Sequence, residues 1–130
     1  MNIQLDNWKV TNLNFNNSEE NKNEERSFNL KVNHYFSSEI SKTFELEFVI
    51  EIYDINFDIA LEMLFLFETE AEITENFKLS NFPKINAPAI VFPYVRAFIS
   101  NFTLQAGFEP IILPSINFVK LAGEIETKDK

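Results

Sequence analysis

The sequence predicts an α+β fold: a four-stranded antiparallel sheet, with one long and one short helix packed on one face of it. Three observations predict this fold. Stretches in the first half of the chain alternate apolar and polar residues with the period of a β-strand. One long apolar stretch with helix signals at both ends comes later in the chain. Strand signals all precede helix signals, which is the order expected when helices gather on one side of an antiparallel sheet.

Two neighbouring stretches give the clearest strand patterns. The first runs from Lys42 to Asp54 and the second from Phe57 to Thr69, each with an apolar residue at every second position. The intervening residues of the first strand are mostly acidic, as expected of a solvated face. Because the connector 54–56 is short and polar, we expect the two strands to form an antiparallel hairpin.

Two further strands are expected nearer the N-terminus. One covers Trp8 to Phe15 with a weaker pattern, and the other runs from Phe28 to Phe36. His34 alternates with apolar residues in the second of these, so we interpret it as a half-buried structural residue rather than a catalytic one. The polar residues 16–26 between these strands have nothing to bury and are predicted to form a mobile loop.

A long apolar helix is predicted from Asn86 to Gly107. Asn86 is expected to cap its start, and Pro88 suits its first turn. Pro93 lies further inside and is expected to remove a backbone hydrogen bond and bend the helix, while Gly107 fits the position just past its end. This helix is apolar nearly all round, which means that it must be covered from more than one direction. We therefore expect the chain to oligomerise.

The rest of the chain completes a single domain over residues 1–130. Asn117 is placed to cap a short second helix that begins at Phe118 and extends towards Ile125. The charged residues 124–130 are expected to fray. A chain of this length is expected to fold around one modest core.

Composition excludes several classes of function. The net charge of −9 argues against nucleic acid and anionic membranes, which select clustered Lys and Arg. With no Cys, one His and two Gly, the chain offers no Cys/His metal site and no glycine-rich phosphate loop. We therefore expect no enzyme activity, catalytic residue, metal or cofactor. The N-terminus has no secretory signal pattern and no apolar run is long enough to span a bilayer, so the expected location is the cytoplasm.

The remaining signal is a surplus of apolar residues, including 15 Phe, on an acidic chain. Exposed apolar surface on such a protein usually marks binding. A surface lined with Phe suits sequence-tolerant capture of unfolded polypeptides, because the ring offers contact area without needing a hydrogen-bond partner.

About a quarter of the chain, from Asn86 to Phe118, resembles the signature of the SecB family of bacterial export chaperones. The shared elements are Pro88, the run Phe92-Pro93-Tyr94-x-Arg96, Ser100-Asn101, Gly107-Phe108-x-Pro110, and Leu113-Pro114-x-x-Asn117-Phe118.

The resemblance implies a homotetramer built as a dimer of dimers, with unfolded clients held in apolar grooves. It implies that edge strands extend the sheet across one interface and that the long helices pack between dimers at the other. The implied client groove comprises Phe28, Leu30, Val32, Phe118 and Leu121. The implied contact with the export motor ATPase comprises Leu66 and Glu68. The implied oligomer interface comprises Phe92, Tyr94, Phe98 and Phe102.

The resemblance stops before the C-terminus, because the family's metal-binding tail has no counterpart in residues 126–130. Three functions remain open on the sequence. The first is an ATP-independent holdase chaperone for protein export. The second is a SecB-like chaperone dedicated to one client, such as an antitoxin. The third is a ligand-binding or structural oligomer with no chaperone role.

Overall fold

The structure, a computed structural model, describes residues 2–17 and 24–128. Most of the loop predicted over residues 16–26 therefore lies outside the described residues. The chain forms two compact units, Met1–Ile73 and Thr74–Lys130, which are called the sheet unit and the helix unit below.

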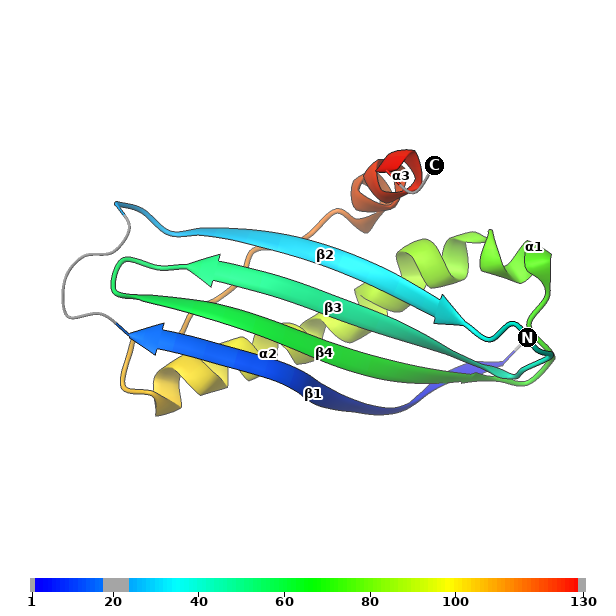
Figure 1. Cartoon of the computed structure of the whole chain (residues 1–130), viewed down its shortest axis with the longest axis horizontal. Helices are drawn as coiled ribbons and strands as arrows, with labels where there is room; N and C mark the ends of the chain where they lie inside the picture. The colour runs from blue at the N-terminus through cyan, green and yellow to red at the C-terminus, as the bar shows by residue number, and fades with distance from the viewer. Residues whose placement is uncertain (1, 18–23, 129–130) are drawn as a thin grey trace. The chain divides into compact units, whose positions relative to one another are not determined.

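The sheet unit is one four-stranded antiparallel sheet in the order β1–β4–β3–β2 (Figure 1). Its strands are β1 (Ile3–Asn17), β2 (Ser27–Phe36), β3 (Thr43–Tyr53) and β4 (Phe57–Thr69). The predicted β3–β4 hairpin is confirmed, since Tyr53 lies opposite Asp58. The Asp54 N–H closes the hairpin by donating to the Phe57 carbonyl at 2.8 Å. This order leaves β1 and β2 at the two edges of the sheet.

The sheet has an apolar face and a polar face, because successive side chains of a strand point to opposite sides. The apolar-face residues of the two central strands are almost fully removed from water. They are Phe44, Leu46, Phe48, Ile50 and Ile52 of β3 and Phe57, Ile59, Leu61, Met63, Phe65 and Phe67 of β4. The rings of Phe44 and Phe67 stack across the strands with centroids 5.1 Å apart. Each fully buried Phe stabilises the fold by roughly 1.5–3 kcal/mol, so this face supplies the core of the sheet unit.

Strand β1 is longer than the sequence indicates, since it runs from Ile3 to Asn17 rather than from Trp8 to Phe15. Its pairing with β4 contains two register shifts, between Leu5 and Asn7 and between Val10 and Asn12. Each shift adds one residue to β1 without a partner and reverses the phase of the alternation. The period-2 signal is therefore interrupted twice, which explains why the strand was underestimated.

The helix unit begins with α1 (Glu75–Lys78) and a π-helical turn, η1 (Phe82–Asn86). Helix α2 (Ala87–Gln105) follows η1 directly (Figure 1). The prediction that Asn86 caps α2 is wrong. Its backbone is helical, with φ −71° and ψ −45°, and its side chain makes no capping hydrogen bond. The preceding π-turn makes a cap at this point unnecessary, because it continues the helical backbone into α2.

Helix α2 continues through Pro93 without a break, although proline has no N–H to donate to the Ala89 carbonyl. The helix then ends where the sequence predicts. Gly107 then adopts a left-handed backbone, with φ +98°. The Phe108 N–H donates to the Thr103 carbonyl at 3.0 Å and the Gly107 N–H to the Leu104 carbonyl at 3.1 Å. These two bonds form a Schellman motif, which satisfies carbonyls that the helix end would leave unpaired.

Helix α3 (Phe118–Lys128) begins where the sequence predicts. Its cap, Asn117, accepts a hydrogen bond at its side-chain oxygen from the Lys120 N–H at 3.1 Å. The helix extends three residues past the expected end at Ile125, to Lys128. Among the helices in the described part of the chain, none has the length and apolar character needed to cross a membrane.

The two glycines of this chain form a matched pair for testing the α2 terminus. Gly107→Ala should lower the free energy of unfolding by about 1 kcal/mol, because a Cβ is disfavoured at positive φ even with open space around it. Gly123→Ala should leave stability unchanged or raise it by about 0.5–1 kcal/mol, since Ala is the better residue in a helix. Chemical denaturation at one fixed protein concentration measures both changes. Equal effects of the two substitutions would contradict this account of the cap.

Candidate functional site

The expected groove residues of the sheet unit lie together on the apolar face of β2. Phe28 lies opposite Ile52, Leu30 opposite Ile50, and Val32 opposite Phe48. Val32 is buried, whereas Phe28 and Leu30 are only half-buried. The row thus continues the core of the central strands out to an edge of the sheet and becomes more exposed towards the start of β2.

The other expected groove residues, Phe118 and Leu121, lie on α3 in the helix unit. Phe118 is buried and meets Phe92 edge-on, with ring centroids 5.6 Å apart. Leu121 is half-buried, one helical turn further along. The expected groove therefore draws one row of residues from each of the two units.

The four residues expected at the oligomer interface are distributed around α2. Phe92 is only 5% exposed, because Phe118 packs against it, and the Arg96 guanidinium lies 5.9 Å from the centre of its ring. Tyr94 is 41% exposed. Phe98 and Phe102 are half-buried and stack on each other, with centroids 6.1 Å apart and ring planes 13° apart. Tyr94 is thus the most accessible of the four, and Phe92 belongs to the interior of the helix unit.

An exposed apolar strip on β1 was missed by the sequence interpretation. Trp8, Val10 and Leu13 lie opposite Phe65, Met63 and Leu61, which puts them on the apolar face. Unlike those buried partners, they are 44%, 39% and 37% exposed. The apolar residues are visible in the sequence, but the bulge between Val10 and Asn12 reverses the alternation, so a strict period of two does not place Leu13 on the same face as Trp8 and Val10.

The expected motor-contact residues lie on the opposite, polar face of the sheet. Leu66 lies opposite Glu45 and Glu68 opposite Thr43, two residues apart on one side of β4. Leu66 is half-buried and Glu68 is exposed. The structure therefore brings these two residues together on one surface, an apolar side chain beside a carboxylate.

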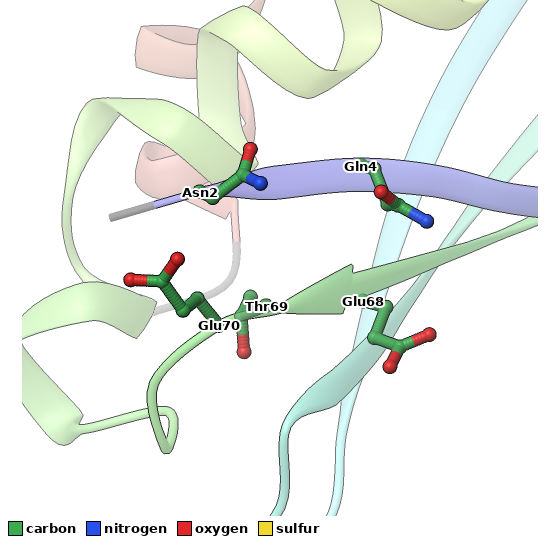
Figure 2. Close-up of a pocket in the computed structure, with 5 residues that line it drawn as sticks. All are labelled: Asn2, Gln4, Glu68, Thr69 and Glu70. Carbon is green, nitrogen blue, oxygen red and sulfur yellow. The ribbon is translucent and has the colours of Figure 1, made fainter.

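A small pocket at one end of the sheet includes Glu68 (Figure 2). Asn2, Gln4, Glu68, Thr69 and Glu70 line it, with a volume of about 230 Å³. Figure 2 shows the Glu68 and Glu70 carboxylates pointing in different directions. Within the described residues, no group of three or more His, Asp or Glu side chains is arranged to hold a metal ion. The pocket is therefore a polar surface hollow and offers no converging set of ligand atoms.

A hydrogen-bonded cluster lies elsewhere on the polar face. The Glu47 carboxylate accepts hydrogen bonds from the Tyr35 hydroxyl and the Asn33 side-chain amide, each at 2.9 Å. The bond to Glu47 raises the pKa of Tyr35 above its ordinary value, with smaller contributions from burial and from the charges of Glu47 and Glu62. Similarly, the Tyr53 hydroxyl donates to Glu51 at 2.9 Å, which raises the pKa of Tyr53.

Glu47→Gln should lower the pKa of Tyr35 towards its ordinary value, because it replaces the charged acceptor of the Tyr35 hydrogen bond with a weaker neutral one and removes the nearby negative charge. The stability linked to this proton is present below the ordinary tyrosine pKa and is lost as pH rises through the raised value. Tyrosine titration followed by NMR measures the shift. Glu51→Gln is the control, since it should change the pKa of Tyr53 and leave that of Tyr35 in place. An unchanged Tyr35 titration in Glu47→Gln would show that the Glu47 carboxylate does not raise the pKa of Tyr35 in solution.

Curated relatives match this chain over part of their length. One is an uncharacterized protein of Methanocaldococcus jannaschii, 41% identical over 68 residues that cover 52% of this chain and 43% of the relative. Another is the protein-export protein SecB of Magnetococcus marinus, 38% identical over 64 residues, or 43% of this chain and 41% of the relative. The matched region thus spans about two fifths of the length of these relatives.

Solved structures share the fold at low sequence identity. A SecB-like chaperone of Mycobacterium tuberculosis, in complex with a ChAD peptide from the HigA1 antitoxin, superposes with a TM-score of 0.70. The two chains are 13% identical, and the match covers 88% of this chain and 87% of the other. A protein of unknown function from Streptococcus agalactiae superposes with a TM-score of 0.58 and 15% identity, over 88% of this chain and 98% of the other.

The comparison with protein families extends the likeness over nearly the whole sequence. The family described as preprotein translocase subunit SecB matches residues 8–125, which include all four strands in whole or part, α2 and the start of α3. The observed sheet, long helix and short helices agree with this match. The chain therefore belongs to the SecB family.

Proposed function

We propose that this chain is an ATP-independent holdase chaperone that binds unfolded polypeptides and delays their folding or aggregation. The observation that carries the proposal is the uneven burial of the apolar face of the sheet. The central strands are almost fully buried there, whereas Leu30 on one edge strand and Trp8 on the other stay partly exposed. Partly exposed apolar rows at sheet edges are suited to extended, apolar segments of a client.

The chemistry of this surface favours clients by their unfolded state rather than by a motif. Burying client apolar surface contributes about 25 cal/mol per Å², and the entropy lost in ordering the client offsets much of this gain. Affinity then grows with the length of accessible apolar segment. The net charge of −9 keeps the chaperone itself dispersed while it exposes apolar side chains.

The expected groove residues give the direct test of client binding. Leu30→Asp and Leu121→Asp should each weaken the binding of a reduced, unfolded client about tenfold or more, because a carboxylate replaces half-buried apolar contact area. The measurements are the dissociation constant and the suppression of client aggregation, with circular dichroism to confirm folding.

Ile40→Asp is the matched control for these variants. Ile40 is 79% exposed in the segment between β2 and β3 and is not among the groove residues, so this change should leave client affinity intact. If Leu30→Asp and Leu121→Asp bind the client as tightly as Ile40→Asp does, the groove lies elsewhere. If the wild-type chain captures no unfolded client, the holdase function itself is refuted.

We further propose that the chain works as a homotetramer, a dimer of dimers in the cytoplasm. Support comes from the two open edges of the sheet and from the apolar side chains that α2 leaves accessible, notably Tyr94 and Ile90, which are 41% and 45% exposed. Such side chains on a helix gain stability when a second helix covers them.

Tyr94→Asp should shift the assembly from tetramers towards dimers, because it places a charge where the α2 helices are proposed to meet. Native mass spectrometry over a dilution series measures the distribution. Ile40→Asp, an exposed substitution in the segment between β2 and β3, serves as a control for added negative charge. A tetramer that resists dilution equally in the wild type and in Tyr94→Asp would remove Tyr94 from the interface.

The client range separates two candidate roles. The family description as a preprotein translocase subunit supports export, in which Leu66 and Glu68 would contact the motor ATPase. The related fold that holds an antitoxin peptide supports the alternative of a single dedicated client. Affinity capture followed by mass spectrometry distinguishes them: a broad set of signal-bearing precursors supports export, and one dominant small protein supports a dedicated chaperone. An intact oligomer that captures neither would favour a ligand-binding or structural role.

A further inference from the structure

The segment that joins α2 to α3 has no regular secondary structure but is firmly attached to α2. This return segment comprises residues 108–117 and reverses direction after Gly107 (Figure 1). Its burial alternates, with Ile111 and Leu113 buried and Ile112 71% exposed. A segment without helix or strand pairing must satisfy its buried backbone groups in some other way.

Two hydroxyl groups of α2 satisfy both backbone groups of Ile111. The Ile111 N–H donates to the Thr103 hydroxyl oxygen at 3.0 Å. The Ser100 hydroxyl donates to the Ile111 carbonyl at 2.5 Å. Thr103 is completely buried, and its own proton is directed back to the helix, where the Ile99 carbonyl lies 2.8 Å away and the Ser100 carbonyl 3.1 Å away. Ser100 and Thr103 therefore both form hydrogen bonds to one residue of the return segment, Ile111, from a single face of α2.

We propose that Ser100 and Thr103 form a hydroxyl clamp that positions α3, and with it the half-buried Leu121, for client binding. This inference rests on the proposed holdase function. It adds two positioning residues, Ser100 and Thr103, which act by holding the return segment and α3 in place.

The return segment is tied to α2 by the hydrogen bond from the Phe108 N–H to the Thr103 carbonyl and by the two hydrogen bonds at Ile111. Helix α3, which follows the segment, packs Phe118 edge-on against Phe92. The hydrogen bonds fix which residue of the segment lies beside Thr103, and the connection from Ile111 to Phe118 links that register to the start of α3.

The hydrogen bonds of the clamp are directional, so they fix the register of the return segment as well as attaching it to α2. Apolar packing alone tolerates sliding, because the contact between aliphatic groups is non-directional. A buried N–H and a buried C=O bonded to two separate hydroxyls allow one register, since any shift leaves a buried polar group without a partner. Loss of the clamp should therefore alter the position of Leu121 on α3 without removing any apolar side chain.

Thr103→Val tests the clamp, because valine keeps the shape of threonine and removes the hydroxyl. We expect it to weaken binding of a reduced, unfolded client about threefold to tenfold, at a temperature at which the variant is fully folded. Exchange of the Ile111 amide hydrogen should accelerate in the same variant. Thr103→Ser, which retains the hydroxyl, should restore both client affinity and amide protection.

Thr69→Val is the matched control in the sheet unit. Thr69 is also buried, and its hydroxyl donates to the carbonyls of Ala71 and Lys42, at 2.7 and 3.1 Å. This variant should lose stability without losing client affinity. If Thr103→Val and Thr69→Val lower the melting temperature alike and neither changes affinity, then Thr103 has only a structural role and the proposal is overturned.

Ser100→Ala provides a second test of the clamp, which applies even if Thr103→Val does not fold. It removes the other half of the clamp and is expected to weaken client binding in the same range, so full affinity in this variant would overturn the clamp. The wild-type measurement separates this inference from the function on which it rests. Failure of the wild type to capture the client refutes the holdase function and any role of the clamp in it, whereas capture by the wild type and Thr103→Val alike refutes the clamp alone.

Discussion

The removal of one face of β3 and β4 from water is the constraint on which the sheet unit depends. Each of these strands carries an apolar side chain at every second position, and nearly all of these side chains are fully buried. Because a slip of one residue would expose the whole set, this burial fixes the register of the central hairpin. The edge strands then pair against a register that is already determined. Their own apolar residues, such as Leu30 and Trp8, are left partly accessible as a result, and accessible apolar edges are what the proposed function requires.

Much of this architecture is predictable from the sequence, because its signals are local. The alternation of apolar residues in β3 and β4 is uninterrupted, so it can be read directly from the sequence. Gly107 and Asn117 act at helix ends through contacts within a few residues. Strand β1 was only partly predicted, since its bulges depend on pairing with β4, a strand far along the chain. Asn86 was predicted wrongly for a related reason: the sequence offers a good capping residue, but the π-turn before it already supplies the helical backbone.

The candidate site was predictable only as two separate rows. Alternation placed Phe28, Leu30 and Val32 on one face of a strand, and the structure confirms that shared face. The exposed strip on β1 and the hydroxyl clamp were not foreseen. A buried threonine in an apolar helix looks like any small core residue in a sequence, and only the reversal of the chain after Gly107 brings the Ile111 backbone to Thr103. Chain reversal and bulges are long-range geometry, which residue periodicity does not encode.

The two bulges in β1 have a consequence for how an open sheet edge behaves in a crowded cell. Unpaired strand edges are templates for amyloid-like growth, and a protein that gathers unfolded chains would meet such partners often. Bulges at Asp6 and Thr11 interrupt the flat repeat of donors and acceptors that stacking of successive strands demands. Such an edge is a poorer template for regular strand addition than a flat, unbroken one. Irregularity in β1 thus works against the repeated strand pairing on which fibril growth depends.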